Sequence, residues 1–262
     1  MKRIVFTSDL QIPFTNYRQV ASHIRFIGEW QPDQVINIGD LTDYPQPSRW
    51  TKDTRGEFEG SVWRDSEKTK RTYFEPLRAV YSGPLGMHIG NHDRRPLDYQ
   101  EKYAPALSTD DPKDNPFYYG ALVDFDGFGV EDLGGFYDVA PDWVSTHGHL
   151  GTPLRQVAGG SAIAAARKLG KSVIQGHTHR MGHIAETFGV VTNSGKHMRT
   201  INGVEVGNMM DIRKADYVTR KTGAANWQAG FCVMYVDGNN VQVVNVPMNG
   251  NGEFLFEGRR WK

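Results

Sequence analysis

Five short clusters of potential metal ligands constrain the fold of this 262-residue chain more than any other feature. Each cluster directly follows an apolar run. The clusters are Asp9-Leu10-Gln11, Gly39-Asp40-Leu41-Thr42-Asp43, Gly90-Asn91-His92-Asp93, His147-Gly148-His149 and Gly176-His177-Thr178-His179. In an open α/β sheet, side chains just beyond the carboxyl ends of parallel strands converge on one crevice. One site drawn from such distant segments requires a single domain, which we expect to span residues 1–262.

The N-terminal segment predicts a parallel crossover unit. Residues 4–6 and 35–38 are short runs rich in β-branched or aromatic residues, as is typical of buried strands. Between them, apolar residues at every third or fourth position over 17–27 predict a helix, with Thr15 or Asn16 as its cap. One helix between two strands favours parallel pairing of those strands.

Further elements follow by the same reasoning. Strands are expected near 86–89, 143–146, 172–175 and 188–192, with a helix from about Pro153 to Leu169. Gly159-Gly160 weakens that helix by about 1 kcal/mol per Gly relative to Ala, so we expect a kink or close packing there. Residues 232–246 alternate around Asp237-Gly238-Asn239-Asn240 and predict a hairpin, for which a second, antiparallel sheet is the simplest location.

Two excursions follow ligand clusters, at about 44–81 and 105–129. The first is predicted to be a loop followed by a helix over about 61–81, and the second is rich in Pro, Asp, Gly and aromatic residues. The apolar face of the helix would be formed by Trp63, Phe74, Leu77 and Tyr81. Such excursions either shape access to a site or decorate the surface of the scaffold.

Charge gives no global indication of a partner, because 30 Lys and Arg balance 30 Asp and Glu. Locally, the basic residues of the stretch 196–223 could follow a nucleic acid backbone, although a solvated loop is the simpler explanation. Trp50 and Trp63, which lie among basic residues, could stack on bases. No membrane association is expected.

The chain is expected to be cytoplasmic. Polar residues interrupt the N-terminus too soon for a signal peptide or a spanning helix. The single Cys232 excludes an intramolecular disulfide and sits in an apolar run, where a small buried residue is a simpler interpretation than a nucleophile.

The chemistry of the clusters predicts the reaction type. Carboxylates, amides and imidazoles mixed in this way suit a pair of hard or borderline divalent ions, and such ions support phosphoryl transfer. Taken singly, His177 or His179 is as well explained as a structural histidine, Asn91 by a left-handed turn and Asp40 by a helix cap. The joint order of all five clusters is far more specific than any one of them.

This order and spacing resemble the calcineurin-like metallophosphoesterases. Residues 4–195 match the family motifs Asp-x-His, Gly-Asp-x-x-Asp, Gly-Asn-His-Asp, His before Gly, and Gly-His-x-His. The resemblance implies an α/β fold that is a four-layer αββα sandwich, two mixed β-sheets flanked by helices. The segments Ser8 to Pro13 and Trp227 to Phe231 are similar to those of single-domain members from bacteriophages. This resemblance implies that the protein acts in the host cytoplasm.

The family's roles can be assigned to matching residues. The resemblance implies that Asp9, Gln11, Asp40 and His179 hold a first ion, and that Asp40, Asn91, His147 and His177 hold a second. Asp40 would bridge the two ions, which together activate a water. His92 would stabilise the transition state or protonate the leaving oxygen, oriented by Asp43.

Gln11 departs from the family pattern, in which most relatives have His. A carboxamide oxygen is harder and weaker than an imidazole nitrogen, which favours Mn²⁺ at the two sites, with Mg²⁺, Zn²⁺, Fe or Ni as alternatives. Because the first-motif His is associated with diesterase chemistry in this family, its replacement bears on the substrate class.

Two residues are candidates for substrate binding. Arg95 could pair with phosphate oxygens or with the acidic residues near 110–114, and His149 could reach the substrate or face solvent. Together these features predict a phosphodiesterase acting on DNA, RNA, a cyclic nucleotide or another nucleotide. The alternatives are a phosphomonoesterase on nucleotides or proteins and a binding or scaffold relative with little turnover.

Overall fold

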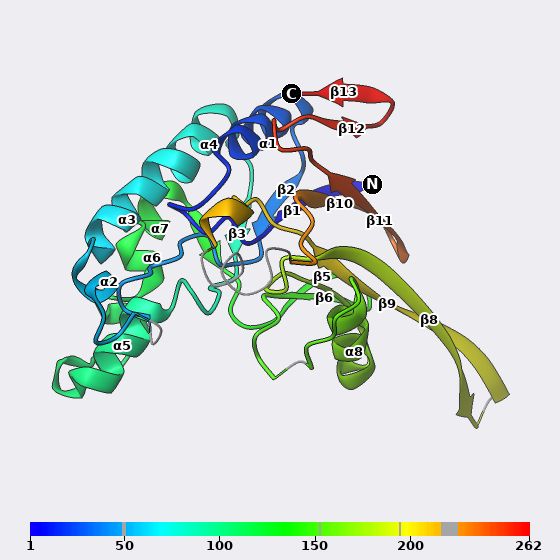
Figure 1. Cartoon of the computed structure of the whole chain (residues 1–262). Coiled ribbons are helices and arrows are strands. Elements are labelled where there is room, and N and C mark those ends of the chain that lie inside the picture. Colours follow the sequence, from blue (N-terminus) through cyan, green and yellow to red (C-terminus); the bar gives the residue numbers. More distant parts are fainter. Residues whose placement is uncertain (49–50, 152, 194, 216–224) are drawn as a thin grey trace.

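The computed structural model describes residues 1–48, 51–151, 153–193, 195–215 and 225–262 (Figure 1). The first of two mixed sheets has the order β11-β10-β1-β2-β3-β4, and the second has the order β5-β6-β7-β9-β8. The strands of the first sheet are β1 (Lys2–Thr7), β2 (Gln34–Asn37), β3 (Leu85–Met87), β4 (Val130–Asp132), β10 (Gly230–Asp237) and β11 (Asn240–Pro247). Those of the second are β5 (Tyr137–Ala140), β6 (Trp143–Thr146), β7 (Ser172–Gln175), β8 (Met181–Thr192) and β9 (Gly195–Val206).

Helices occupy the connections between strands, and a small hairpin closes the chain. The longer α-helices are α1 (Tyr17–Trp30), α3 (Val62–Thr69), α4 (Glu75–Val80), α5 (Arg95–Tyr103) and α8 (Gly160–Leu169). The short ones are α2 (Arg55–Phe58), α6 (Tyr119–Leu122) and α7 (Phe125–Phe128), with a π turn at Lys70–Phe74 and 3-10 turns at Pro105–Leu107, Pro112–Asp114 and Ile212–Lys214. The hairpin consists of β12 (Phe254–Phe256) and β13 (Arg259–Trp261).

Side-chain alternation along the strands produces three apolar layers. Ile4 and Phe6 of β1 point into the layer between the two sheets, where they join Ile174 of β7. Val5 points to the opposite face, toward the helical layer that includes Phe26 of α1. A third layer lies between the second sheet and α8. The predicted four-layer αββα sandwich is therefore confirmed.

Several predicted elements are confirmed in detail. Strands β6 and β7 have the predicted bounds, and β1 pairs with β2 in parallel across α1. Asn16, rather than Thr15, caps α1: its side-chain oxygen accepts hydrogen bonds from the backbone N–H groups of Arg18 at 3.1 Å and Gln19 at 3.4 Å. Cys232 is fully buried, as expected.

The C-terminal hairpin lies in a different sheet from the one predicted. Strand β10 pairs antiparallel with β1, with Met234 opposite Ile4, and so extends the first sheet. Both faces of β10 are buried: Cys232 and Met234 face the layer between the sheets, while Phe231 and Val233 face the helices. The alternation correctly predicted a hairpin, but it does not identify the partner of the hairpin's inner strand.

Two helix predictions need correction. The helix expected from Pro153 starts at Gly160, and Gly159 has φ of +81° and precedes it, so the glycine pair marks the helix start rather than a kink. Glu205 of β9 accepts the N–H groups of Gly159 at 2.9 Å and Ser161 at 3.2 Å, which supplies the missing cap. In the helix over 61–81, Trp63 is 54% exposed and does not belong to the buried face.

Two further expectations concern the rest of the chain. The strand predicted at 188–192 is the outer part of β8, which forms a long hairpin with β9 that extends away from the body (Figure 1). Trp50 and residues 216–223 of the basic stretch lie outside the described residues, so the structure does not place them. Among the residues that it does describe, none of the helices has the length and apolar character needed to cross a membrane.

Candidate metal centre

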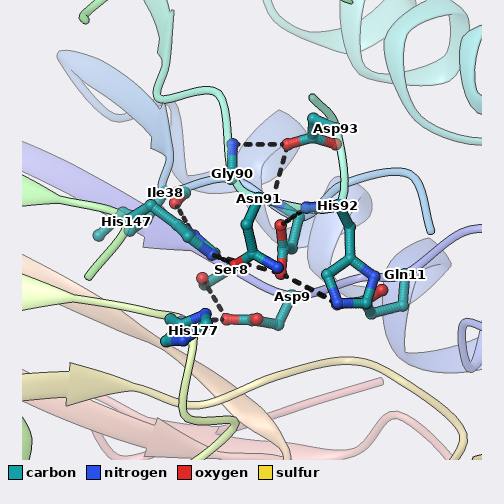
Figure 2. Close-up of polar contacts among 12 residues, drawn as sticks. Ser8, Asp9, Gln11, Ile38, Gly90, Asn91, His92, Asp93, His147 and His177 are labelled. Carbon is teal, nitrogen blue, oxygen red and sulfur yellow. Dashed lines mark hydrogen bonds and ion pairs between the residues drawn. The ribbon is translucent and has the colours of Figure 1, made fainter. Parts of the chain in front are cut away.

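The five clusters meet where strands of both sheets end. Asp9, Asp40 and Asn91 follow β1, β2 and β3 of the first sheet, whereas His147 and His177 follow β6 and β7 of the second. Figure 2 shows the side chains of Asp9, Asn91, His147 and His177 gathered in one place. Strands β1, β2 and β3 pair in parallel in that order, and so do β6 and β7. The clusters therefore converge, as their positions after strands predicted, and the site that they form bridges the two sheets.

The backbone of this site is unusual. Five residues of the clusters adopt left-handed φ angles between 52° and 68°, although none is glycine: they are Asp9, Gln11, Asp40, His177 and His179. Such a conformation costs about 1–3 kcal/mol for a residue other than glycine and commonly occurs at functional sites. The tight turns bring the side chains back over the strand ends.

Asp40 lies at the centre of the cluster. Its Oδ2 atom is 3.3 Å from Nε2 of His147, 3.3 Å from Nε2 of Gln11 and 3.8 Å from Nε2 of His92. The site offers three ligand atoms, one each from Asp40, His147 and His177, that lie within 4.8 Å of one another. This is close enough for a shared cation. The Oδ1 atom of Asn91 is 3.1 Å from Nε2 of His147. The residues predicted for a second ion are therefore brought together.

The residues predicted for a first ion are also adjacent. Nε2 of His179 lies 3.4 Å from Oδ1 of Asp9, and the other oxygen of Asp9 accepts hydrogen bonds from Ser8 Oγ at 2.5 Å and from the N–H of His177 at 2.9 Å. Gln11 reaches the same region through its contact with Asp40. Trp227 stacks on His179, with ring centroids 4.2 Å apart and an interplanar angle of 20°.

These residues fit divalent ions. Several buried donor atoms of the cluster have no hydrogen-bond partner in the described part of the chain: Asp9 Oδ1, Gln11 Oε1, His177 Nδ1 and His179 Nδ1. Buried polar atoms are normally satisfied, so a bound ion would account for these. The donor set of carboxylate, amide and imidazole suits hard or borderline metals.

Buried charges shift the pKa values in this cluster. Burial raises the pKa of Asp9 to about 7, although the nearby His147 opposes the shift. For Asp40, burial alone would raise the pKa, but the charges of His147 and His92 hold it well below its usual value. Burial would lower the pKa of His147, and the carboxylate of Asp40 instead raises it to about 9. In the metal-free protein, His147 and Asp40 therefore form an ion pair where a cation would otherwise balance the carboxylate.

His92 is oriented by the predicted partner. Its Nδ1 atom is 2.7 Å from Oδ1 of Asp43, and its backbone N–H donates to Oδ1 of Asp40 at 2.8 Å. Arg95 donates from one guanidinium nitrogen to the Asp43 carbonyl oxygen at 2.7 Å and from another to Nε2 of His92 at 3.1 Å. Arg95 therefore lies beside His92 rather than against the acidic residues 110–114.

His149 lies beside the candidate ligands. Its ring centroid is 5.2 Å from that of His147 and 6.3 Å from that of His177, and burial lowers its pKa to about 4. The side chain is therefore only partly accessible to solvent. Arg94 forms an ion pair with Asp98, at 3.0 Å.

Asp93 is a site residue to which the sequence reasoning gave no role. Its carboxylate accepts the backbone N–H groups of Asp40 at 2.7 Å, Gly90 at 2.9 Å and Thr42 at 2.9 Å. Burial raises the pKa of Asp93 to about 7. Asp93 is the last residue of the third cluster in the sequence, but two of the three N–H groups that it accepts, those of Asp40 and Thr42, belong to the second cluster.

His92 lines two clefts. The smaller, which we name the Trp227 cleft, has a volume of about 260 Å³. Its lining consists of Asp40, His92, Leu154, His177, Thr178, His179, Arg180 and Trp227. The larger, the Tyr103 cleft, has a volume of about 440 Å³. Its lining consists of Pro47, Ser48, Lys52, Asn91, His92, Arg95, Asp98, Tyr99, Lys102 and Tyr103.

A mixed α/β fold with a buried cluster of carboxylates and imidazoles at its strand ends defines a metal-dependent hydrolase. The sequence model of the calcineurin-like phosphoesterases matches residues 2–181, and the chain belongs to this family. The resemblance inferred from the motifs is thereby confirmed, and the family implies metal-dependent hydrolysis of phosphoesters.

The chain is similar to two phage proteins and, more distantly, to several solved structures. The chain is 48% identical over 262 residues to the Gene 54 proteins of Mycobacterium phages L5 and D29, covering 100% of this chain and 99% of each relative. The predicted similarity to phage proteins is thereby confirmed. Vps29 from Cryptosporidium parvum has 15% identity and a TM-score of 0.43, covering 99% of this chain and 94% of that one. YfcE, a phosphoesterase from E. coli, has 12% identity and a TM-score of 0.39, covering 92% and 98%.

Proposed function

We propose that this protein is a dinuclear phosphodiesterase that hydrolyses phosphodiesters of nucleic acids or nucleotides. The observation that carries the preference for diesters is that His92 lines both the Trp227 cleft and the Tyr103 cleft. A phosphodiester has a substituent on each side of the phosphorus atom, whereas a monoester needs room for only one. A site with two clefts therefore favours a diester.

In this proposal, one ion is held by Asp9, Gln11, Asp40 and His179, and a second by Asp40, Asn91, His147 and His177. Bound divalent ions lower the pKa of a water molecule and polarise phosphoryl oxygens. Mn²⁺ is favoured because Gln11 supplies an oxygen where an imidazole nitrogen is usual. The short contacts of Asp40 with residues from both sets support its role as the bridging ligand.

The protein's own residues would position the substrate and supply the proton. Asp43 holds the imidazole of His92 in a fixed orientation, with Nε2 directed to the centre of the site, from where it would protonate the leaving oxygen. Arg95 would turn its guanidinium from His92 to a phosphate oxygen, which releases Nε2 of His92 for this task. His149 would contact the substrate from the side of His147 and His177.

The whole chain would act as one domain. The first excursion, 44–81, supports a role in site access because Pro47, Ser48 and Lys52 line the Tyr103 cleft. The second, 105–129, would stabilise the first, since the ring of Phe117 packs against that of Trp63 with centroids 5.9 Å apart. The phage relatives favour the cytoplasm of a bacterial host as the place of action.

The test compares two chromogenic substrates in the presence of Mn²⁺. We expect faster hydrolysis of bis-p-nitrophenyl phosphate than of p-nitrophenyl phosphate. The opposite ratio would support a phosphomonoesterase, and no turnover of either would support a binding protein. The variant His92→Ala should lose activity by about 100-fold or more. As a matched control, His183→Ala removes an exposed imidazole that is hydrogen-bonded to Asn202, and it should retain activity.

A further inference from the structure

Helix α5 carries a row of functional side chains away from the metal centre. The helix starts at Arg95, two residues after Asp93, and its buried face consists of Pro96, Leu97 and Gln100. Arg95, Tyr99 and Tyr103 are spaced by four residues, so they lie along one side of the helix. Eight residues of helix span about 12 Å. These three residues all line the Tyr103 cleft, which therefore leads outward from His92.

Two tyrosine rings form an aromatic wall in this cleft. The centroids of Tyr99 and Tyr103 are 4.6 Å apart, and the ring planes are inclined by 53°. Tyr103 is 42% exposed. The hydroxyl of Tyr99 donates to Glu57 Oε1 at 2.7 Å, which fixes that ring in place. Tyr99 is half-buried, so the two rings together offer a partly exposed aromatic surface that is suited to stacking with another planar group.

The wall is surrounded by positive charge. The ammonium group of Lys52 lies 3.4 Å from the centroid of the Tyr103 ring, and that of Lys102 lies 5.2 Å from it. Arg95 adds a third cation at the inner end of the cleft. The acidic residue of the lining, Asp98, is already paired with Arg94. The cleft therefore combines aromatic surface with a surplus of positive charge.

We propose that the Tyr103 cleft is a nucleoside-binding subsite, in which a nucleobase stacks on Tyr99 and Tyr103 while Lys52 and Lys102 meet the next phosphate of the strand. Aromatic rings for bases and cations for the backbone are the two features of single-strand recognition. This inference rests on the proposed function, and it specifies the substrate as a nucleotide or single-stranded nucleic acid. The Trp227 cleft would accept the other substituent of the diester.

Calorimetric titration of the full-length, Mn²⁺-loaded protein tests the subsite. The two probes are thymidine 5′-monophosphate and 2-deoxyribose 5-phosphate, which differ only in the base. We expect the wild-type protein to bind the nucleotide about tenfold more tightly than the sugar phosphate, in line with base stacking on aromatic side chains. Tyr103→Ala should reduce this ratio to about twofold or less. The affinity for the sugar phosphate should not change.

Two further variants control the result. Tyr103→Phe retains the ring and should retain the preference for the nucleotide. Tyr17→Ala removes a tyrosine that is 40% exposed and also has lysine ammonium groups near its ring, but it lies outside both clefts and should leave the ratio unchanged. Thermal melts of each variant establish that it is folded.

The outcomes separate this inference from the proposed function. Equal affinity of the wild-type protein for both probes, or an undiminished ratio in folded Tyr103→Ala, would overturn the subsite even if bis-p-nitrophenyl phosphate is hydrolysed. A base-dependent preference that is lost in Tyr103→Ala supports the subsite. If that preference is found in a protein that hydrolyses neither chromogenic ester, the proposed function fails and the subsite remains.

Discussion

His92 and Asp43 are joined by a contact of 2.7 Å between the imidazole Nδ1 and the carboxylate Oδ1. This contact fixes the proton of the neutral ring on Nδ1 and leaves Nε2 directed to Asp40, 3.8 Å away. Burial opposes the charged form of His92, but the carboxylates of Asp40 and Asp43 outweigh it and raise the pKa. His92 is thus prepared to carry a proton.

Asp43→Asn should lower kcat by about tenfold to a hundredfold, because the amide cannot favour the charged imidazole. KM should change little, since Asp43 does not reach the substrate. Loss of the carboxylate also lowers the pKa of His92, so the alkaline limb of the kcat profile should move to lower pH. Steady-state hydrolysis of bis-p-nitrophenyl phosphate across pH measures both effects. Asp138→Asn, which alters an exposed ion pair with Lys171, is the control. An unchanged profile would contradict a positioning role.

Gln11→His should strengthen metal binding at the first site. The unpaired Oε1 of Gln11 is a weaker ligand than an imidazole nitrogen, and the substitution restores the usual family residue. Titration with Zn²⁺ and Mn²⁺ should show a larger gain for Zn²⁺, of about tenfold or more. Gln242→His places an imidazole on the exposed face of β11 and should have no effect. Identical titration curves for Gln11→His and the wild-type protein would refute the assignment.

Asp93→Asn should weaken both the fold and the site. The Asp93 carboxylate accepts three buried backbone N–H groups, including that of Asp40, and an amide can accept fewer of them and with less strength. We expect the free energy of unfolding to fall by about 1–3 kcal/mol in the metal-free protein. Chemical denaturation measures this loss, and a lower affinity for Mn²⁺ should accompany it. A variant as stable as the wild-type protein would show that the loop is held by other contacts.

The burial of His23 predicts that the free energy of unfolding falls in acid, independently of the metal centre. This side chain is buried in α1 against Phe231, and burial lowers its pKa to about 3 from 6.5. Between these two pKa values, His23 is protonated in the unfolded chain but neutral in the folded protein. The free energy of unfolding therefore falls as the pH drops below 6.5. Between pH 7 and pH 5 the loss is about 2 kcal/mol. His23→Leu should remove this part of the pH dependence in urea denaturation. Equal slopes for both proteins would disprove the effect.

The strand ends could be predicted from the sequence because each buried apolar run is followed at once by potential metal ligands. A buried strand followed by Asp, Asn or His is a strong local pattern, and this is why β6 and β7 were predicted to the residue. The partner of the C-terminal hairpin was missed, since alternation reports only that a strand has a buried face. The start of α8 was misplaced because its cap, Glu205, is distant in the sequence.

The site was predicted less completely at its margins. Asp93 and Trp227 act through contacts with segments that are far apart in the chain, and no local pattern reports such contacts. The aromatic residues singled out for stacking were Trp50 and Trp63, whereas the cleft beside His92 is lined by Tyr99 and Tyr103. Their spacing of four residues after the Gly-Asn-His-Asp motif was a usable signal, because it places both on one side of a helix.

The candidate ligands are divided between two sheets, and this division has a consequence for metal selectivity. His88, three residues before Asn91, bonds through Nε2 to the Ser145 hydroxyl at 2.8 Å, two residues before His147, and so ties the sheets together beside the ligands. The thickness of the apolar layer between the sheets thus sets the distance between the ligands of the first sheet and those of the second. A larger or smaller side chain in that layer would therefore change the ionic radius that the site binds best, although no ligand is replaced.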